Sequence, residues 1–231
     1  MNKEELYAVL TGDIVDSRKF KGNWELLLKI IKESLSFVEN YFSKHMKYSF
    51  EISGGDSFQT VILNIEEALL IAISLRASLR YFCKARKVEN SLDARIAIGI
   101  GEIDYLPQAE FDTSSTGSGE AFHLSRPYLD KVKKGNQRLF INSPWKEINS
   151  EFDVECSLLD EIIKKWSSKS AEAILYKMVN FTQEKMAKVI GITQPAVNGR
   201  LRIAGANPID KLCDRYKKLI IQKIGFKTYN H

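Results

Sequence analysis

The chain has few of the residues that build disulfide-stapled or zinc-stabilised domains. Its 231 residues include only three cysteines, three histidines and five prolines. Cys83, Cys156 and Cys213 are odd in number, far apart and outside any Cys-x-x-Cys spacing. The sequence therefore predicts neither a disulfide framework nor a zinc site, and we expect the three thiols to pack as small apolar side chains.

Long apolar runs are absent as well. No stretch approaches the ~18 consecutive apolar residues of a membrane span. The first residues, MNKEELYAVL, lack the basic, apolar and small-residue order of a secretion signal. With 44% hydrophobic and 27% charged residues, the composition is that of a globular protein with at least one sizeable core. We expect a cytoplasmic protein that has no membrane partner.

Positive charge is concentrated towards the C-terminus. From Lys164 onward there are 14 Lys and Arg residues against four Asp and Glu, a surplus of ten, whereas the residues before it hold 20 against 25. A basic segment attached to a mildly acidic body is typical of proteins that meet a polyanion. The plainer interpretation is that these lysines and arginines lie on solvated helix faces.

Hydrophobic periodicity divides the chain into an α+β part and an all-helical part. The expected strands and helices alternate along the first part; strands are predicted at residues 6–15, 48–52, 57–63, 93–103 and 137–142, and helices at 24–42, 65–86 and 120–134. This order predicts a ferredoxin-like antiparallel sheet with helices on one face. Residues 151–165 fit either a strand or a helix. We expect two domains, residues 1–163 with the sheet and residues 164–231 with helices only.

Residues 183–201, QEKMAKVIGITQPAVNGRL, have the parts of a helix-turn-helix. Ala187 lets two helices approach, Gly191 can end the first helix in a left-handed conformation, and Thr193 can cap the second, which has Pro195 in its first turn. The side chains expected to contact DNA bases and phosphates are Thr193, Gln194, Asn198, Arg200 and Arg202. A plain packing unit, or a module that binds RNA or protein, is the alternative.

Two aspartates follow a glycine beside a predicted strand, in Gly12-Asp13 and Gly55-Asp56. If those strands are neighbours, both carboxylates reach the same rim of the sheet. Together with the carbonyl of Ile14 they would form a hard-oxygen site for Mg²⁺, which could clamp a triphosphate. The simpler interpretation is that each aspartate caps its turn.

Several motifs together resemble known families. GDIVDS, ISGGDSFQTVI, ARIAIGIGEI and GEAFHLSR follow in order the landmarks of class III nucleotidyl cyclase domains. With the C-terminal QEKMAKVIGITQPAVNGRLRIAG, the chain resembles the SatD family more closely, whose members join a cyclase-like domain to a helix-turn-helix. The string GGDSF is also similar to the signature of diguanylate cyclases, which share this type of sheet.

The resemblance implies a nucleotidyl-cyclase-type sheet with a metal and nucleotide site. It makes Asp13, Ile14 and Asp56 the ligands of Mg²⁺ or Mn²⁺, and Arg126 the residue that contacts phosphate. It also implies a homodimer, because the substrate site of cyclases straddles two protomers.

The same comparison implies a loss of catalysis. The cyclases' base-reading lysine and transition-state asparagine fall on Ile52 and Phe122, which cannot donate hydrogen bonds. Loss of one such donor typically costs ~10²–10³ in rate. We therefore expect a DNA-binding transcriptional regulator whose N-terminal domain senses a nucleotide or dimerises. An active purine nucleotide cyclase that depends on Mg²⁺ or Mn²⁺ is kept as the alternative.

Overall fold

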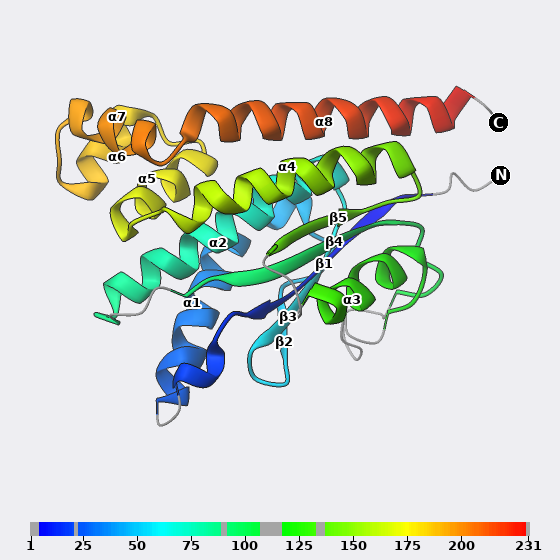
Figure 1. Cartoon of the computed structure of the whole chain (residues 1–231), viewed down its shortest axis with the longest axis horizontal. Helices are drawn as coiled ribbons and strands as arrows, with labels where there is room; N and C mark the ends of the chain where they lie inside the picture. Colours follow the sequence, from blue (N-terminus) through cyan, green and yellow to red (C-terminus); the bar gives the residue numbers. More distant parts are fainter. Residues whose placement is uncertain (1–4, 21–22, 89–91, 107–116, 133–136, 230–231) are drawn as a thin grey trace.

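The computed structural model describes residues 5–20, 23–88, 92–106, 117–132 and 137–229. A five-stranded sheet lies at the centre, and helices cover both of its faces (Figure 1). The strands are β1 (Tyr7–Ile14), β2 (Glu51–Ser53), β3 (Ser57–Ile62), β4 (Ala94–Gly101) and β5 (Leu139–Asn142). The helices are α1 (Trp24–Phe42), α2 (Ala68–Ala85), α3 (Glu120–Val132), α4 (Lys146–Lys164), α5 (Ser168–Met178), α6 (Gln183–Ile190), α7 (Gln194–Ile203) and α8 (Ala206–Tyr229).

The sheet has the strand order β2-β3-β1-β4-β5. The predicted sequence of elements is confirmed, but the prediction of an antiparallel sheet is wrong for its last strand, because β5 runs parallel to β4. Parallel neighbours need a crossover connection, and α3 lies in that connection. The helix predicted at residues 120–134 is therefore the crossover helix α3.

Helices also cover both faces of the sheet instead of one. Ala8 and Leu10 of β1 belong to the main core with α1 and α2, whereas Val9 packs on the opposite face with Ala121 and Phe122 of α3. The sequence carries the reason, since β4 is apolar at nearly every position and both of its faces are buried. The one-sided arrangement expected from the sequence is therefore wrong for α3.

The hairpin between β2 and β3 forms as predicted. Gly54 has φ +59° and Gly55 has φ +90°, a backbone conformation that side chains other than glycine rarely adopt. Gly99 of β4 has a different role, because a Cβ there would lie 2.2 Å from the carbonyl oxygen of Ala121. The absence of a side chain at Gly99 lets α3 lie directly on the sheet.

The residues left open between strand and helix form α4, which begins at Lys146, before the predicted segment. One hydrophobic core extends across the predicted boundary at residues 163 and 164, and it includes side chains of α2, α4, α5 and α8. The Tyr216 hydroxyl of α8, fully buried, donates to the carbonyl oxygen of Ile65 at 2.8 Å. The division into two domains stays a prediction, and the two segments are packed together.

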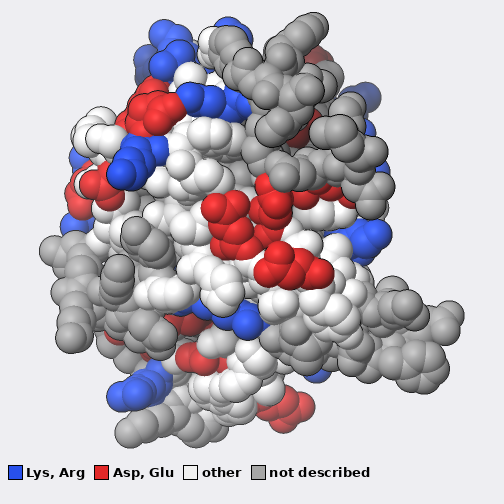
Figure 2. Space-filling model, turned by 90° about the vertical axis from the view of Figure 1, so that its right-hand side faces the viewer, with Lys and Arg blue, Asp and Glu red and all other residues white. Residues whose placement is uncertain are grey.

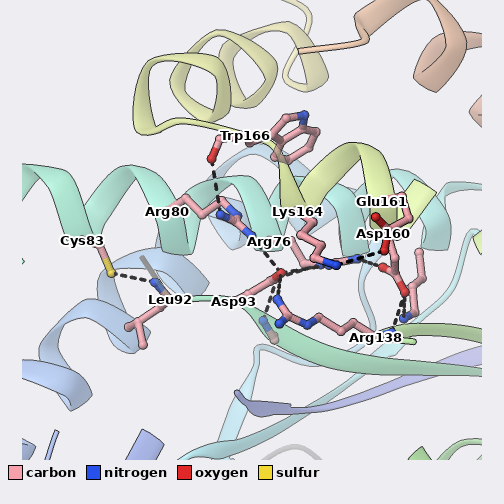
Figure 3. A network of polar contacts seen from close by, with 12 residues as sticks. Arg76, Arg80, Cys83, Leu92, Asp93, Arg138, Asp160, Glu161, Lys164 and Trp166 are labelled. Atoms are coloured by element: carbon pink, nitrogen blue, oxygen red, sulfur yellow. Dashed lines mark hydrogen bonds and ion pairs between the residues drawn. The ribbon is translucent and has the colours of Figure 1, made fainter. Parts of the chain in front are cut away.

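A buried network of charged side chains joins the sheet to α2 and α4 (Figure 3). Arg76 of α2 is fully buried and donates from Nε and Nη2 to the two carboxylate oxygens of Asp93, at 2.8 and 2.9 Å. Its Nη1 forms an ion pair with Asp160 of α4. Arg80 and Arg138 also donate to Asp93, at 3.0 and 2.7 Å.

Asp93 remains charged although it is buried. Burial opposes ionisation of its carboxyl group, but the charge and hydrogen bonds of Arg76, with the charges of Arg80 and Arg138, outweigh this and hold the pKa of Asp93 well below its usual range. Asp160 accepts backbone hydrogen bonds from Arg138 and Leu139 at 2.5 and 3.2 Å. The network thus fixes the starts of β4 and β5 against α2 and α4.

Two of the cysteines pack as expected. Cys83 and Cys156 are buried in the core, Cys213 is half-buried, and all three are free thiols. Burial raises the pKa of the Cys213 thiol to about 12. Among the described residues, no helix combines the length and the apolar character that crossing a membrane requires.

We expect Asp93→Asn to destabilise the protein at neutral pH by about 3–5 kcal/mol, because it leaves buried arginines without their anion. Because the pKa of Asp93 is depressed in the folded protein, its contribution is complete above the unfolded pKa near 4 and is lost as the pH falls further. Urea unfolding of both proteins between pH 7 and pH 3 checks this: the difference in free energy of unfolding should narrow below about pH 4.

The matched control is Glu161→Gln, which removes an exposed carboxylate paired with Lys164 on the same helix as Asp160. It should change stability by less than about 1 kcal/mol. Two results would contradict the role of Asp93 as the buried anion of this network. One is an equal loss of stability in Asp93→Asn and Glu161→Gln. The other is a difference in free energy of unfolding between Asp93→Asn and the unchanged protein that widens as the pH falls.

Candidate functional site

A row of polar side chains lies on the face of the sheet that α3 covers. Asp13 of β1 stands opposite Ser57 of β3 and Arg95 of β4. Arg95 Nη1 donates to Asp13 Oδ2 at 3.0 Å, and Asp13 is only 9% exposed. We call this row the polar rim; it comprises Thr11, Asp13, Ser57, Gln59, Arg95, Ser125 and Arg126.

The rim continues from Asp13 towards α3. Gln59 Oε1 accepts from Thr11 Oγ1 at 3.3 Å and from Arg126 Nε at 3.1 Å. The Thr11 and Ser125 hydroxyl oxygens are 3.0 Å apart, and the Arg126 guanidinium lies over the ring of Phe122. The structure thus places Arg126 on the same face as Asp13.

Asp56 lies at the same end of the sheet as Asp13. The expectation that their strands are neighbours is confirmed, because β1 pairs with β3. The backbone N–H of Ile14 donates to the carbonyl oxygen of Asp56 at 3.1 Å, and the Ser17 hydroxyl donates to Asp56 Oδ2 at 2.5 Å. These bonds join the β2–β3 turn to the end of β1 and the segment that follows it.

The arrangement of these two aspartates does not fit a bound divalent cation. Their carboxylates are hard-oxygen donors, but Asp13 is paired with the cation of Arg95 and Asp56 accepts from Ser17. Within the described ranges, no group of three or more His, Cys, Asp or Glu side chains converges in a way that could hold a metal ion. Arg95 thus already supplies positive charge at Asp13 Oδ2.

The two positions that depart from the cyclase pattern have packing roles. Phe122 is 2% exposed and belongs to the small apolar cluster between α3 and the sheet, and Ile52 is half-buried against the main core. Neither side chain offers a hydrogen bond to a base or a ribose.

The local features predicted for residues 183–201 are present. The Thr182 hydroxyl accepts from the N–H of Lys185 at 3.2 Å and so caps α6. Gly191 ends α6 with φ +74°, and Thr193 caps α7 by accepting from the N–H of Ala196 at 3.4 Å. Pro195 lies in the first turn of α7, where the missing N–H costs little.

The face of α7 that points away from the core is polar. Val197 and Leu201 are buried, while Gln194, Asn198 and Arg202 are exposed. Gln194 also donates to Glu184 of α6 at 2.9 Å. Of the five residues expected to contact DNA, three therefore lie on the exposed face and Thr193 serves as the cap.

The side chain of Arg200, which was expected to contact DNA, is instead turned towards another helix of the protein. Its Nη1 donates to Glu172 of α5 at 2.7 Å, and the arginine side chain is 20% exposed. Since it follows Val197 by three residues, it lies at the edge of the buried stripe. Its charge is engaged within the protein.

Part of the positive charge of the C-terminal segment is neutralised by ion pairs within the same chain. Cations of α8 pair with acids of the preceding residues: Arg215 with Glu151, Lys217 with Glu67, and Lys223 with Glu147. Sequence analysis missed these pairs because they join residues 64 to 150 positions apart. The opposite charges of the two segments were the only available signal.

The fold is that of an α+β protein with a mixed sheet and a helical C-terminal unit. It carries two polar surfaces, the polar rim and the outer face of α7. Within that class, the chain belongs to the SatD family, whose model matches residues 7–207. A search of characterised proteins found no match.

Three solved structures are similar to this chain at low identity. They are the guanylyl cyclase Cya2 (14% identity, TM-score 0.41, 59% of this chain and 74% of that one), the adenylyl cyclase CyaB from P. aeruginosa (13%, 0.41, 64% and 81%) and a bacterial light-regulated adenylyl cyclase (10%, 0.38, 59% and 74%). At TM-scores below 0.5, these likenesses carry no functional conclusion.

The cap of α7 gives a direct test of this geometry. We expect Thr193→Ala to lower stability by about 1 kcal/mol because the N–H of Ala196 loses its acceptor. Hydrogen exchange should show the loss as faster exchange in α7. Thr193→Ser keeps the hydroxyl and should behave like the unchanged protein; equal exchange in all three would show that the cap is not formed.

Proposed function

We propose that this protein binds double-stranded DNA through α6 and α7, which act as a helix-turn-helix with α7 as the recognition helix. The observation that carries the proposal is the division of α7 into two faces. Val197 and Leu201 hold it on the underlying helices, while Gln194, Asn198 and Arg202 remain at the surface. Amide and guanidinium side chains are those that read base edges in the major groove.

The charge around α7 supports the same proposal. Lys185 and Lys188 of α6 are exposed, as is Arg202, and such cations provide the contacts to phosphates that dominate affinity for DNA. Figure 2 shows the end of the molecule that lies on the right in Figure 1, away from α6 and α7, and acidic side chains gather at the middle of that face. A nucleic acid is therefore favoured at the α6–α7 end.

The remainder of the chain would sense a ligand or hold two copies together. The order β2-β3-β1-β4, with α1 and α2 on one face, supports our proposal of a ferredoxin-like sheet that β5 extends. With the motifs, this supports a nucleotidyl-cyclase-type domain over residues 1–163 and a DNA-binding unit over residues 164–231. We propose the polar rim as the place where the sensed ligand would bind.

A chain of hydrogen bonds connects the sheet to α7. Through it, a ligand bound at the polar rim would influence the position of α7. The N–H of Val15, next to the rim, donates to the carbonyl oxygen of Asp93 at 2.9 Å. Arg80 donates to both the Asp93 carboxylate and the carbonyl oxygen of Trp166, at 3.0 and 3.4 Å. Trp166 Nε1 in turn donates to the carbonyl oxygen of Ala204 at the end of α7, at 2.8 Å.

Binding to sheared genomic DNA at increasing salt tests the proposal. The apparent affinity should fall steeply with salt concentration, because bound cations are released from the phosphates. The double variant Asn198→Ala, Arg202→Ala should bind about tenfold more weakly or worse, with a shallower salt dependence. Fluorescence anisotropy of labelled fragments measures both quantities.

Lys146→Ala is the matched control, since it removes an exposed cation at the start of α4, at the other end of the molecule from α7 (Figure 1). Its binding should equal that of the unchanged protein. Absence of binding at low salt, or the same loss in the control, would refute the proposal. Arg200 is unsuitable for this test because its ion pair with Glu172 makes it structural.

The alternative, an active Mg²⁺- or Mn²⁺-dependent purine nucleotide cyclase, has one observation in its favour: Asp13 and Arg126 lie on the same face of the sheet. Arg95, Ile52 and Phe122 weigh against it.

Incubation with ATP or GTP and Mn²⁺, followed by chromatography, distinguishes the two functions. We expect no cyclic product because neither Ile52 nor Phe122 can donate a hydrogen bond. A cyclic product that disappears in Asp13→Ala would establish the alternative. A rise in melting temperature with nucleotide, without product, would support a sensor.

A further inference from the structure

An apolar groove runs between α4 and α8 on the surface of the protein. Its volume is about 340 Å³, and its walls are mostly apolar side chains of the two helices: Leu158, Leu159, Ile162, Pro208, Ile209 and Leu212. Leu158 is 63% exposed, and Val154, one turn earlier on α4, is 61% exposed. Large apolar side chains this exposed and this close together mark a surface that meets another protein.

The two helices carry opposite charges along this groove. The α4 side presents Glu151 and Glu155, and the α8 side presents Lys211 and Arg215. The helices are antiparallel, as the pairs of Glu151 with Arg215 and Glu147 with Lys223 require (Figure 1). Glu151 and Arg215 pair with each other across the two helices, so the charges left for a partner are Glu155 on the α4 side and Lys211 on the α8 side, beside the apolar groove.

Glu155 indicates that the face is incomplete in a single chain. Its Oε2 is buried and has no hydrogen-bond partner within the described ranges of the chain. Burial and the neighbouring charge of Glu151 raise the pKa of this carboxyl group. A buried carboxylate oxygen without a donor is costly, and a cation or amide from a second chain would remove that cost.

We infer that the protein forms a homodimer in which the α4–α8 faces of two copies pack together, with α4 of each copy lying over α8 of its partner. A twofold axis parallel to the helices produces this arrangement. It places Glu155 of each copy near Lys211 of the other and brings Leu158 of each copy to the apolar groove of the other. A twofold axis perpendicular to the helices would instead set α4 on α4 and oppose like charges.

A second copy is favoured over another partner because the surface is complementary to itself in both sign and apolar content. The inference does not depend on DNA binding, and it uses a different surface from the polar rim. The parallel twofold axis also leaves both α7 helices at the same end of the dimer.

Sedimentation velocity of the full chain over a range of concentrations tests the inference. The unchanged protein should dimerise, and Leu158→Glu should raise the dissociation constant of the dimer by roughly 100-fold or more, because both copies lose an apolar contact. Val189→Glu is the matched control, since Val189 is 53% exposed on α6, away from the groove. Far-ultraviolet circular dichroism checks that each variant is folded.

Cross-linking then distinguishes the two pairings. Leu158→Cys in one tagged chain should cross-link to Lys211→Cys in a differently tagged chain, and Leu158→Cys should react poorly with itself. The unchanged chain with the same short reagent gives the background from its own thiols. A monomeric wild type, a dimer unaffected by Leu158→Glu, or dominant cross-linking of Leu158→Cys to itself would each overturn the inference.

Discussion

The ion pair between Arg76 and Asp93 is the constraint on which the arrangement of the whole molecule depends. Each charged group loses several kcal/mol of hydration when it is buried. The loss is offset here because the guanidinium is bidentate on Asp93 and also reaches Asp160, while two further arginines reach Asp93. The sheet, α2 and α4 can therefore take only the relative positions that satisfy this cluster.

Much of the local structure could be predicted because its causes are local. The glycines between β2 and β3 require a turn, and Thr182, Gly191 and Thr193 mark the ends of α6 and α7 with their own side chains or backbone. The neighbouring positions of Asp13 and Asp56 also followed from the order of strands. In each case the determining residues lie within a few positions of the feature, or the pattern of elements leaves few topologies.

The remaining features depend on contacts that no sequence pattern specifies. Arg76 lies within the helix predicted at residues 65–86, and nothing nearby predicted its partners, 17 and 84 positions away. Arg95 lies in the strand predicted at residues 93–103, and no sequence pattern indicates that its charge compensates Asp13. The basic C-terminal segment suggested a unit free to meet phosphates, whereas α8 uses several cations to hold the acidic body.

Trp166 stands between the two parts of the chain, with its carbonyl oxygen bonded to Arg80 and its indole nitrogen to Ala204. The helix that carries the polar face is thereby tethered to the same arginine cluster that holds the sheet. Rotation of α7 as an independent lever would first have to break a buried indole bond. Any reorientation of α7 therefore also requires the segment between α4 and α5 to move.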